Sequence, residues 1–243
     1  MIKELNKTIE NTEYIKEKVE NIKDSIFKKK LKEIHNTNKI ETSFENQKNV
    51  PNMKDFHKGC DLRSQPNLIY SDDHPGSIRI IKHDIDVILK KNFNFYDINE
   101  ELKNKILELN LSYDIFNICI YESEFAPYYL INDLKNHEKI NLTIAILDII
   151  FGGVALDKDN NFLFLDGIDV AKEILNKNPY SIIIFYTGCD LNVHSTEYQK
   201  IDNLLKEFPD NILITDKDID DNKRIEVLYK GFKKFKERFN NVT

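Results

Sequence analysis

Five polar side chains that could bind a metal ion and a phosphoryl group stand where apolar runs of the chain end. They are Asp72, Asp73, Asp148, Thr187 and Lys217. The runs before them are rich in β-branched and aromatic residues without polar alternation, which is typical of strands buried on both faces. In an open parallel sheet, ligands bind at the carboxyl ends of the strands. The sequence therefore predicts one site where three carboxylates, a hydroxyl and an ammonium converge.

These residue types suit magnesium and phosphoryl transfer. Carboxylate oxygens are the hard ligands that Mg²⁺ prefers, so Asp73 and Asp148 are predicted metal ligands, with Asp72 binding directly or through water. A carboxylate attacks a phosphoryl group only when the surrounding charge is neutralised. Lys217 would offset negative charge at such a group, and the Thr187 hydroxyl would donate to a phosphoryl oxygen.

Each of these residues also has an ordinary structural role open to it. An aspartate at the end of a strand is often the N-cap of the next helix, which suits Asp148 and also Asp73, placed just before Pro75. Thr187 could cap a helix or a turn. Lys217 stands among aspartates and could be a solvated loop charge.

Strand-like and helix-like segments alternate after residue 66 and would position the site. The predicted strands are 67–71, 115–121, 142–148, 181–186 and 211–215. The predicted helices are 75–91, 125–138, 167–177, 196–207 and 222–239. Strands that alternate with helices indicate an α/β fold with a doubly wound, five-stranded parallel sheet.

The rest of the chain divides into an N-terminal helical extension, a linker and two insertions. Residues 1–35 lack glycine and proline and carry apolar residues at helical spacing, whereas 36–65 are polar and predicted to be a linker. The main domain is predicted at 66–243, with an inserted helix in about 92–114 and an inserted hairpin in about 152–165. No DNA-binding or enzymatic output domain is expected after the last helix.

The apolar stripes of the N-terminal helix do not share one heptad pattern. Ile15, Val19, Ile22 and Ile26 form one stripe, and the residues before them form another. A short coiled coil, a helical hairpin, docking on the main domain and a solvated helix all remain open. A homodimer through this helix is one partner prediction.

The composition and net charge of the chain restrict its predicted partners and its predicted cellular compartment. The 243 residues carry a formal net charge of −6, so no basic footprint for nucleic acid is present. No apolar run reaches the roughly 18 residues of a membrane span, and the protein is predicted to be cytoplasmic. Cys60, Cys119 and Cys189 show no metal-ligand spacing, and the last two are predicted to be small buried core residues. His57 with Cys60 is too small a set for a metal site.

Over about residues 66–239 the chain resembles the receiver domain of two-component response regulators. The passage that matches the family best begins with Asp166-Gly167 and a helix over 168–174. It continues with Asn178-Pro179, an apolar strand over 182–185 and the pair Thr187-Gly188. In this resemblance Asp148 matches the phosphoacceptor, Lys217 the family's lysine, and Asp72 and Asp73 its acidic pair.

The resemblance implies a function in phosphorelay signal transduction. A histidine kinase or phosphotransfer protein would pass a phosphoryl group to Asp148 with Mg²⁺. A hydrogen bond to the phosphoryl group would then draw Thr187 inward and move the loop after the fourth strand. Output would be binding to an unidentified downstream protein. Any enzymatic activity would be limited to phosphorylation and dephosphorylation of the domain itself.

Departures from the family pattern leave an alternative function open. Gly152-Gly153 stand where a proline usually follows the phosphoacceptor, and Asp218 replaces the proline that usually follows the lysine. The aromatic switch position falls on Ile214. These changes and the insertions also fit a receiver-like module that binds a protein without phosphotransfer.

Other interpretations of the acidic residues are weaker. Glu122 and Glu124 could be the acidic pair, but that register leaves only four strands before the end of the chain. A haloacid dehalogenase-like phosphatase would need an aspartate where Ile150 stands. The stretch 157–161 resembles the start of an EF-hand loop, but Phe162 replaces the required glycine, so a hairpin turn is predicted.

Overall fold

A five-stranded parallel sheet forms the centre of the protein in the computed structural model, which describes residues 51–53, 56, 59–188 and 196–242. Its strands are β1 (Asn67–Asp72), β2 (Asn117–Glu122), β3 (Thr143–Leu147), β6 (Ile182–Thr187) and β7 (Ile212–Asp216). They lie in the order β2-β1-β3-β6-β7, and all neighbours are parallel. In sequence numbering this is the 2-1-3-4-5 order of a doubly wound sheet. The predicted fold class is confirmed.

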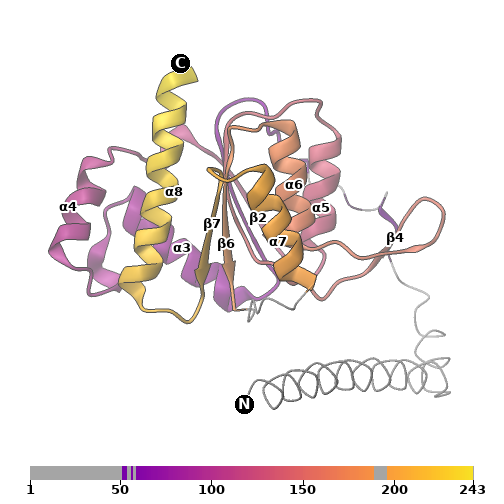
Figure 1. The fold of residues 1–243 in the computed structure, drawn as a ribbon, viewed down its shortest axis with the longest axis horizontal. Coiled ribbons are helices and arrows are strands. Elements are labelled where there is room, and N and C mark those ends of the chain that lie inside the picture. Colours follow the sequence, from indigo (N-terminus) through magenta and orange to yellow (C-terminus); the bar gives the residue numbers. More distant parts are fainter. Residues whose placement is uncertain (1–50, 54–55, 57–58, 189–195, 243) are drawn as a thin grey trace, which may run out of the picture. The chain divides into compact units, whose positions relative to one another are not determined.

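Helices cover both faces of the sheet (Figure 1), and the central strands β1, β3 and β6 are buried throughout, which explains why they lack polar alternation. In the edge strand β2, the apolar side chains of Ile118 and Ile120 are instead exposed. One face carries α3 (Pro75–Leu89) and α8 (Asp221–Val242), and the other carries α5 (Ala126–Lys135), α6 (Gly167–Lys177) and α7 (Thr196–Glu207). Successive strand residues point to opposite faces. Leu68 and Tyr70 pack with α3 and α8, whereas Ile69 packs with α5 and α6.

Both predicted insertions contain regular structure. The first comprises η2 (Phe93–Phe95), α4 (Glu100–Glu108) and η3 (Tyr113–Ile115), and Leu102 and Ile106 of α4 pack into the α3–α8 core. The second contains an antiparallel hairpin of β4 (Ala155–Leu156) and β5 (Phe162–Leu163). Asp157 Oδ1 accepts the backbone N–H groups of Asp159 and Asn161, so this aspartate stabilises a turn as the sequence predicted.

The segment before β1 packs against the sheet domain where it is described. Phe56 and Leu62 are buried, and Cys60 forms a disulfide with Cys119 of β2. The prediction that Cys119 is an ordinary core residue was therefore wrong about its chemistry, although the side chain is buried. Its partner is 59 residues away in sequence, and only the fold brings the two sulfur atoms together. The domain boundary at residue 66 stays a prediction.

Several predictions concern residues outside the described part of the chain. They are the N-terminal helix of 1–35, its coiled coil and homodimer, most of the linker, His57 and Cys189. Among the described helices, none combines the length and apolar character needed to cross a bilayer.

Candidate functional site

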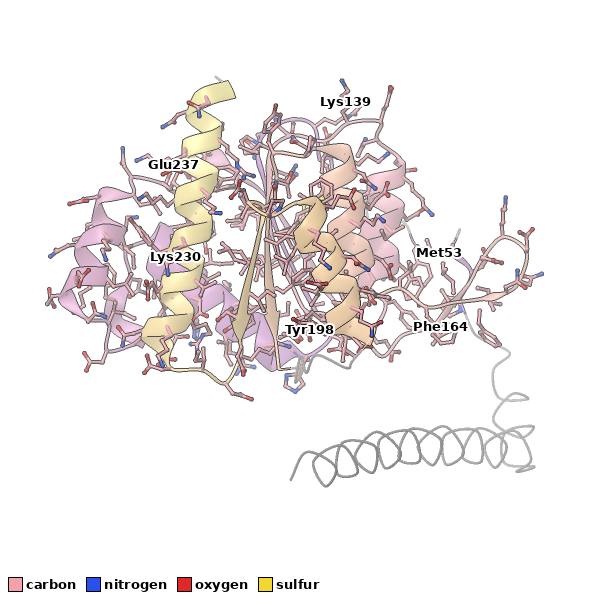
Figure 2. All side chains as sticks on the ribbon, viewed as in Figure 1. Met53, Lys139, Phe164, Tyr198, Lys230 and Glu237 are labelled. Carbon is pink, nitrogen blue, oxygen red and sulfur yellow. A yellow bond between two sulfur atoms is a disulfide. The ribbon has the colours of Figure 1, made fainter. Side chains whose placement is uncertain are left out.

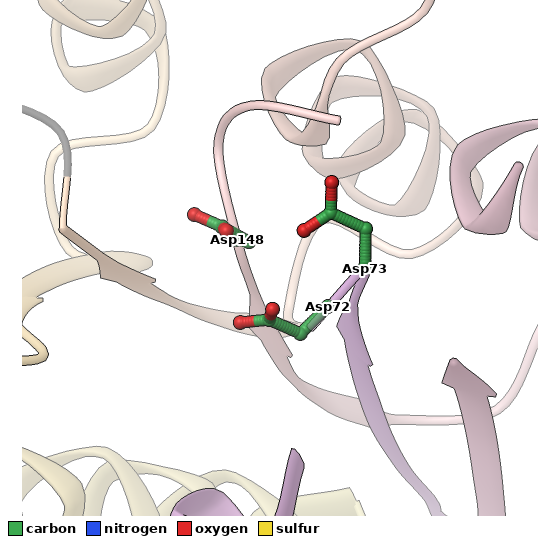
Figure 3. Close-up of side chains that lie close together, drawn as sticks. All are labelled: Asp72, Asp73 and Asp148. Atoms are coloured by element: carbon green, nitrogen blue, oxygen red, sulfur yellow. The ribbon is translucent and has the colours of Figure 1, made fainter. Parts of the chain in front are cut away.

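The ends of two neighbouring strands bring the three predicted aspartates together. Asp72 ends β1, Asp73 follows it, and Asp148 comes directly after β3. The backbone N–H of Asp148 donates to the Ser71 carbonyl oxygen at 2.9 Å, which extends the pairing of β1 with β3 up to the site. Each aspartate offers one oxygen, and the three oxygens lie within 4.8 Å of one another (Figure 3).

Lys217 reaches this cluster from the loop after β7. Its Nζ lies 2.6 Å from Asp148 Oδ2 and 2.7 Å from Asp72 Oδ2. Its backbone N–H donates to the Thr187 carbonyl oxygen at 3.0 Å, so the ends of β6 and β7 hold the base of the lysine. The long side chain then spans the distance to the β1 and β3 ends. Lys217 is therefore an interior counter-charge, and its side chain is only 16% exposed.

The charge balance of the site is negative. Three carboxylates face one ammonium, which leaves two negative charges in excess. Burial raises the pKa of the Asp72 carboxyl, against the opposing effects of Lys217 and the His74 backbone N–H. Burial alone would lower the pKa of the Lys217 ammonium, but its contacts with Asp148 and Asp72 outweigh burial and raise that pKa.

The donor set fits a hard divalent cation. All three candidate ligands are carboxylates, the ligand type that Mg²⁺ and Ca²⁺ prefer. Asp72 Oδ1 accepts the His74 N–H at 2.9 Å. Asp72 Oδ2 is buried, and the Lys217 ammonium lies 2.7 Å from it. A buried anionic oxygen of this kind is stabilised when a cation binds it.

Backbone N–H groups complete the surroundings of two of the carboxylates. Ile149 N–H donates to Asp148 Oδ1 at 2.7 Å, and Gly152 N–H lies 3.3 Å from Asp73 Oδ2. At Gly153, a Cβ atom would lie 2.3 Å from the Glu124 carbonyl oxygen, so only glycine fits there. Sequence reasoning treated this glycine pair only as a departure, although two adjacent glycines are a signal of close backbone approach.

Asp166 and Gly167, the Asp-Gly pair of the receiver-like passage, support the site but are not part of the acidic cluster. A Cβ atom at Gly167 would lie 1.8 Å from the Asp148 carbonyl oxygen, so glycine lets the first turn of α6 abut the backbone of Asp148. Asp166 caps α6 by accepting the N–H groups of Ile168 and Asp169. This pair can be recognised in the sequence because a helix N-cap favours a few short polar residues and the close approach at the next position requires glycine.

The other residues that the sequence singled out are Thr187, Glu122 and Glu124. Thr187 ends β6 and is buried, and its carbonyl oxygen holds Lys217, while the loop 189–195 after it lies outside the described residues. Glu122 and Glu124 belong to β2 and the loop after it, and the acidic cluster contains neither. The acidic residues that meet Asp148 are therefore those of β1, which lies between β2 and β3.

No family model matches the chain, and no curated protein matches it in sequence. Solved structures of receiver domains match it in fold. A receiver domain from Clostridium thermocellum is 14% identical, with 73% of this chain and 99% of that chain covered and a TM-score of 0.40. A CheY-like receiver domain from Methanospirillum hungatei is 11% identical, with 72% and 99% covered and a TM-score of 0.41.

A response regulator receiver protein from Sinorhizobium medicae is 15% identical, with 70% of this chain and 95% of that chain covered and a TM-score of 0.35. The fold assignment itself is carried by the strand order of the sheet described above. The chain has a divergent receiver-like fold with an acidic cluster at the carboxyl ends of its strands.

Proposed function

We propose that this protein is a phosphorelay receiver whose phosphoacceptor is Asp148. A histidine kinase or phosphotransfer protein would present a phosphohistidine, and a carboxylate oxygen of Asp148 would attack its phosphorus atom. The N–P bond breaks, and the histidine leaves with the electron pair and takes up a proton. The observation that supports this most is the Lys217 ammonium, 2.6 Å from Asp148 Oδ2 within an acidic cluster.

The surrounding charges are the main requirement for such a transfer. Phosphorylation adds about 1.5 to 2 negative charges to a site that already has an excess of carboxylates. Lys217 would offset part of this charge, and the Thr187 hydroxyl is the proposed donor to a phosphoryl oxygen. Bound Mg²⁺, held by Asp72, Asp73 and Asp148, would neutralise much of the remainder. The phosphorylated form would then signal by binding another protein.

The test is direct phosphorylation by a small donor. Incubation with acetyl phosphate and Mg²⁺ should add one phosphoryl group, detected by intact mass spectrometry, and peptide mapping after borohydride reduction should place it on Asp148. Asp148→Asn should abolish the modification. Asp218→Asn is the matched control, because Asp218 is exposed and lies next to Lys217 in sequence, so it should be modified like the wild type. Equal modification of Asp148→Asn would refute the assignment of Asp148.

A protein-binding module without phosphotransfer is the second candidate. Exposed apolar side chains gather around the hairpin: Ile150, Phe162 and Phe164 are 50%, 47% and 71% exposed, and Figure 2 shows Phe164 beside the hairpin. Ile150 and Phe164 also line a surface cavity of about 410 Å³. Ile214, at the position of the aromatic switch, is 37% exposed on β7. A wild-type chain that binds Mg²⁺ but takes no phosphoryl group would favour this second function.

A further inference from the structure

A buried ion pair that the sequence did not reveal joins three of the elements around the acidic site. Asp84 of α3 is 0% exposed and Arg224 of α8 is 4% exposed. Arg224 Nε donates to Asp84 Oδ2 at 2.7 Å, and Nη2 donates to Oδ1 at 3.2 Å. The hydroxyl of Tyr186, the residue before Thr187 on β6, donates to Asp84 Oδ2 at 2.9 Å. Helices α3 and α8 and strand β6 therefore meet at one carboxylate.

The same guanidinium also holds the loop that carries Lys217. Arg224 Nη1 donates to the Ile219 carbonyl oxygen at 3.2 Å, and Nη2 donates to Asp221 Oδ1 at 2.7 Å. Ile219 is two residues after Lys217, in the turn between β7 and α8. On the other side, the Lys217 N–H is bound to the Thr187 carbonyl oxygen at 3.0 Å. The loop is thus held at both ends close to the lysine.

The first insertion packs over this guanidinium. The ring centroid of Tyr96 lies 5.4 Å from the Arg224 guanidinium carbon, within the range of a cation–π contact. Asn222, two residues before Arg224, accepts the Asn99 N–H at 2.9 Å and donates to the Asp97 carbonyl oxygen at 3.0 Å. These contacts fix the insertion to the first turn of α8 and cover Arg224.

Stability alone is a weak reason for placing an arginine at this position. The cost of removing two charges from water offsets most of their attraction, and apolar residues of similar volume often stabilise a core as well. Arginine, however, presents several N–H groups in a rigid planar fork. Here all three of its nitrogens donate, to Asp84, to Asp221 and to the carbonyl oxygen of Ile219. A lysine would keep the charge but has a single nitrogen.

We propose that Arg224 is a positioning residue that holds the Lys217 ammonium at Asp148. Asp84 fixes the guanidinium in the interior, the guanidinium fixes the Ile219 carbonyl, and the loop held in this way directs Lys217 into the acidic cluster. The inference rests on the proposed phosphoacceptor function for its consequence, but the positioning of Lys217 can be measured without it.

Arg224→Lys is the informative variant, and Arg238→Lys is its matched control. Arg238 lies on the same helix and also binds backbone carbonyls, of Tyr180, Ser181 and Asp210, away from the acidic cluster. Two quantities are measured in each full-length variant. The first is the rate of phosphorylation of Asp148 by acetyl phosphate. The second is the reactivity of Lys217 toward an amine-selective acylating reagent, read by peptide mass spectrometry.

In Arg224→Lys, phosphorylation is expected to slow by about tenfold to a hundredfold, the scale that results when a group near the chemistry is misplaced by an ångström. Lys217 acylation should rise several-fold, because the amine loses its fixed place between two carboxylates. Arg238→Lys should leave both quantities near the wild-type values. Wild-type Lys217 reactivity in Arg224→Lys would overturn the proposal.

A double-variant comparison distinguishes a change in the position of Lys217 from a general loss of structure. If Arg224 acts through Lys217, Arg224→Lys should not lower the phosphorylation rate further in a protein that already carries Lys217→Ala. If Arg224→Lys lowers the rate equally in the wild type and in Lys217→Ala, the proposal is contradicted. If the wild type takes no phosphoryl group, the proposed function fails, but the acylation measurement still decides the position of Lys217.

An apolar replacement covers the case in which Arg224→Lys does not fold. The triple variant Asp84→Leu, Tyr186→Phe, Arg224→Met replaces the buried ion pair and the Tyr186 hydroxyl together, so that neither Asp84 nor Arg224 is left as a buried charge without its counter-charge. It is expected to fold, shown by a cooperative melting transition, and to expose Lys217 to acylation. A folded triple variant with a protected Lys217 would also overturn the proposal.

Discussion

Two neighbouring charge clusters in this protein differ in how completely their charges are matched. In the acidic site, three carboxylates lie together, and the single ammonium of Lys217 contacts two of them, Asp148 and Asp72. In the interior cluster, the Arg224 guanidinium binds the buried Asp84 and the half-exposed Asp221, and both oxygens of Asp84 are hydrogen-bonded. The acidic site therefore fits a bound cation, whereas the interior cluster does not.

This difference has a physical basis in the cost of burying charge. A buried charge is tolerated when it is paired and its hydrogen bonds are made, which describes Asp84 and Arg224. Carboxylates crowded together without a cation repel one another and raise at least one pKa. Burial is the main cause of the raised pKa of Asp72, and repulsion from Asp148 adds to it. A bound cation, as proposed above, would offset this cost.

The largest expected effect comes from breaking the balanced cluster. Arg224→Ala should lower the free energy of unfolding by about 3–5 kcal/mol, because it leaves the Asp84 carboxylate buried without a counter-charge. Urea denaturation measures this loss. Lys200→Ala is the control: Lys200 lies 2.5 Å from Asp166, but its side chain is 44% exposed. That change should cost about 1 kcal/mol or less. Equal losses would mean that Asp84 is not desolvated as described.

A smaller effect, opposite in sign, is expected when a cation reaches the unbalanced cluster. Mg²⁺ at ten times its dissociation constant should stabilise the protein by about 1.4 kcal/mol, because it binds only the folded chain. Thermal melting with and without Mg²⁺ measures this gain. Asp148→Asn should abolish the gain, and Asp218→Asn should retain it. A wild-type melting curve that does not respond to Mg²⁺ would count against the metal site.

The smallest expected effect is the change in the free energy of unfolding when an aspartate of each cluster is replaced by asparagine. In a chelator at neutral pH, Asp72→Asn should raise the free energy of unfolding, because it removes a carboxylate whose pKa is raised by burial. Asp84→Asn should instead lower it, because Arg224 would then lack its buried counter-charge and keep only the half-exposed Asp221. Denaturant melts of the two variants provide the comparison. A loss of stability in both would remove the distinction between the clusters.

The pH dependence of the metal-free protein follows from the raised pKa of Asp72. Its folded pKa lies above the unfolded value, so the stability linked to this group is full below the unfolded pKa. That stability is lost as pH rises through the folded pKa. The wild type in chelator should therefore lose more stability over this pH interval than Asp72→Asn does. Parallel pH profiles would contradict the assignment.

The central strands could be predicted because both of their faces are buried. Continuous apolar runs that end in polar residues identified each strand, and the strand ends led to Asp72, Asp73, Asp148 and Lys217. The convergence of these residues follows from a general property of parallel sheets, whose carboxyl ends share one edge. The observed distances agree with that expectation of proximity, while the chemical roles stay proposals.

Other contacts could not be predicted because no local pattern marks them. Cys60 and Cys119 have no informative spacing, and Arg224 and Asp84 are 140 residues apart, each on a helix with many other charged residues. Whether a charged residue of a helix faces water or the interior depends on the neighbouring elements, and periodicity alone does not settle it.

The sequence by itself determined the alternation of strands and helices and the acidic ends of β1 and β3, because local burial and chain direction fix both. Tertiary structure alone decided which two carboxylates Lys217 contacts, that Gly153 abuts Glu124, and that Arg224 binds the loop after Lys217. The reason is distance along the chain. These contacts depend on the relative placement of strand ends and helices, and no short stretch of sequence encodes that placement.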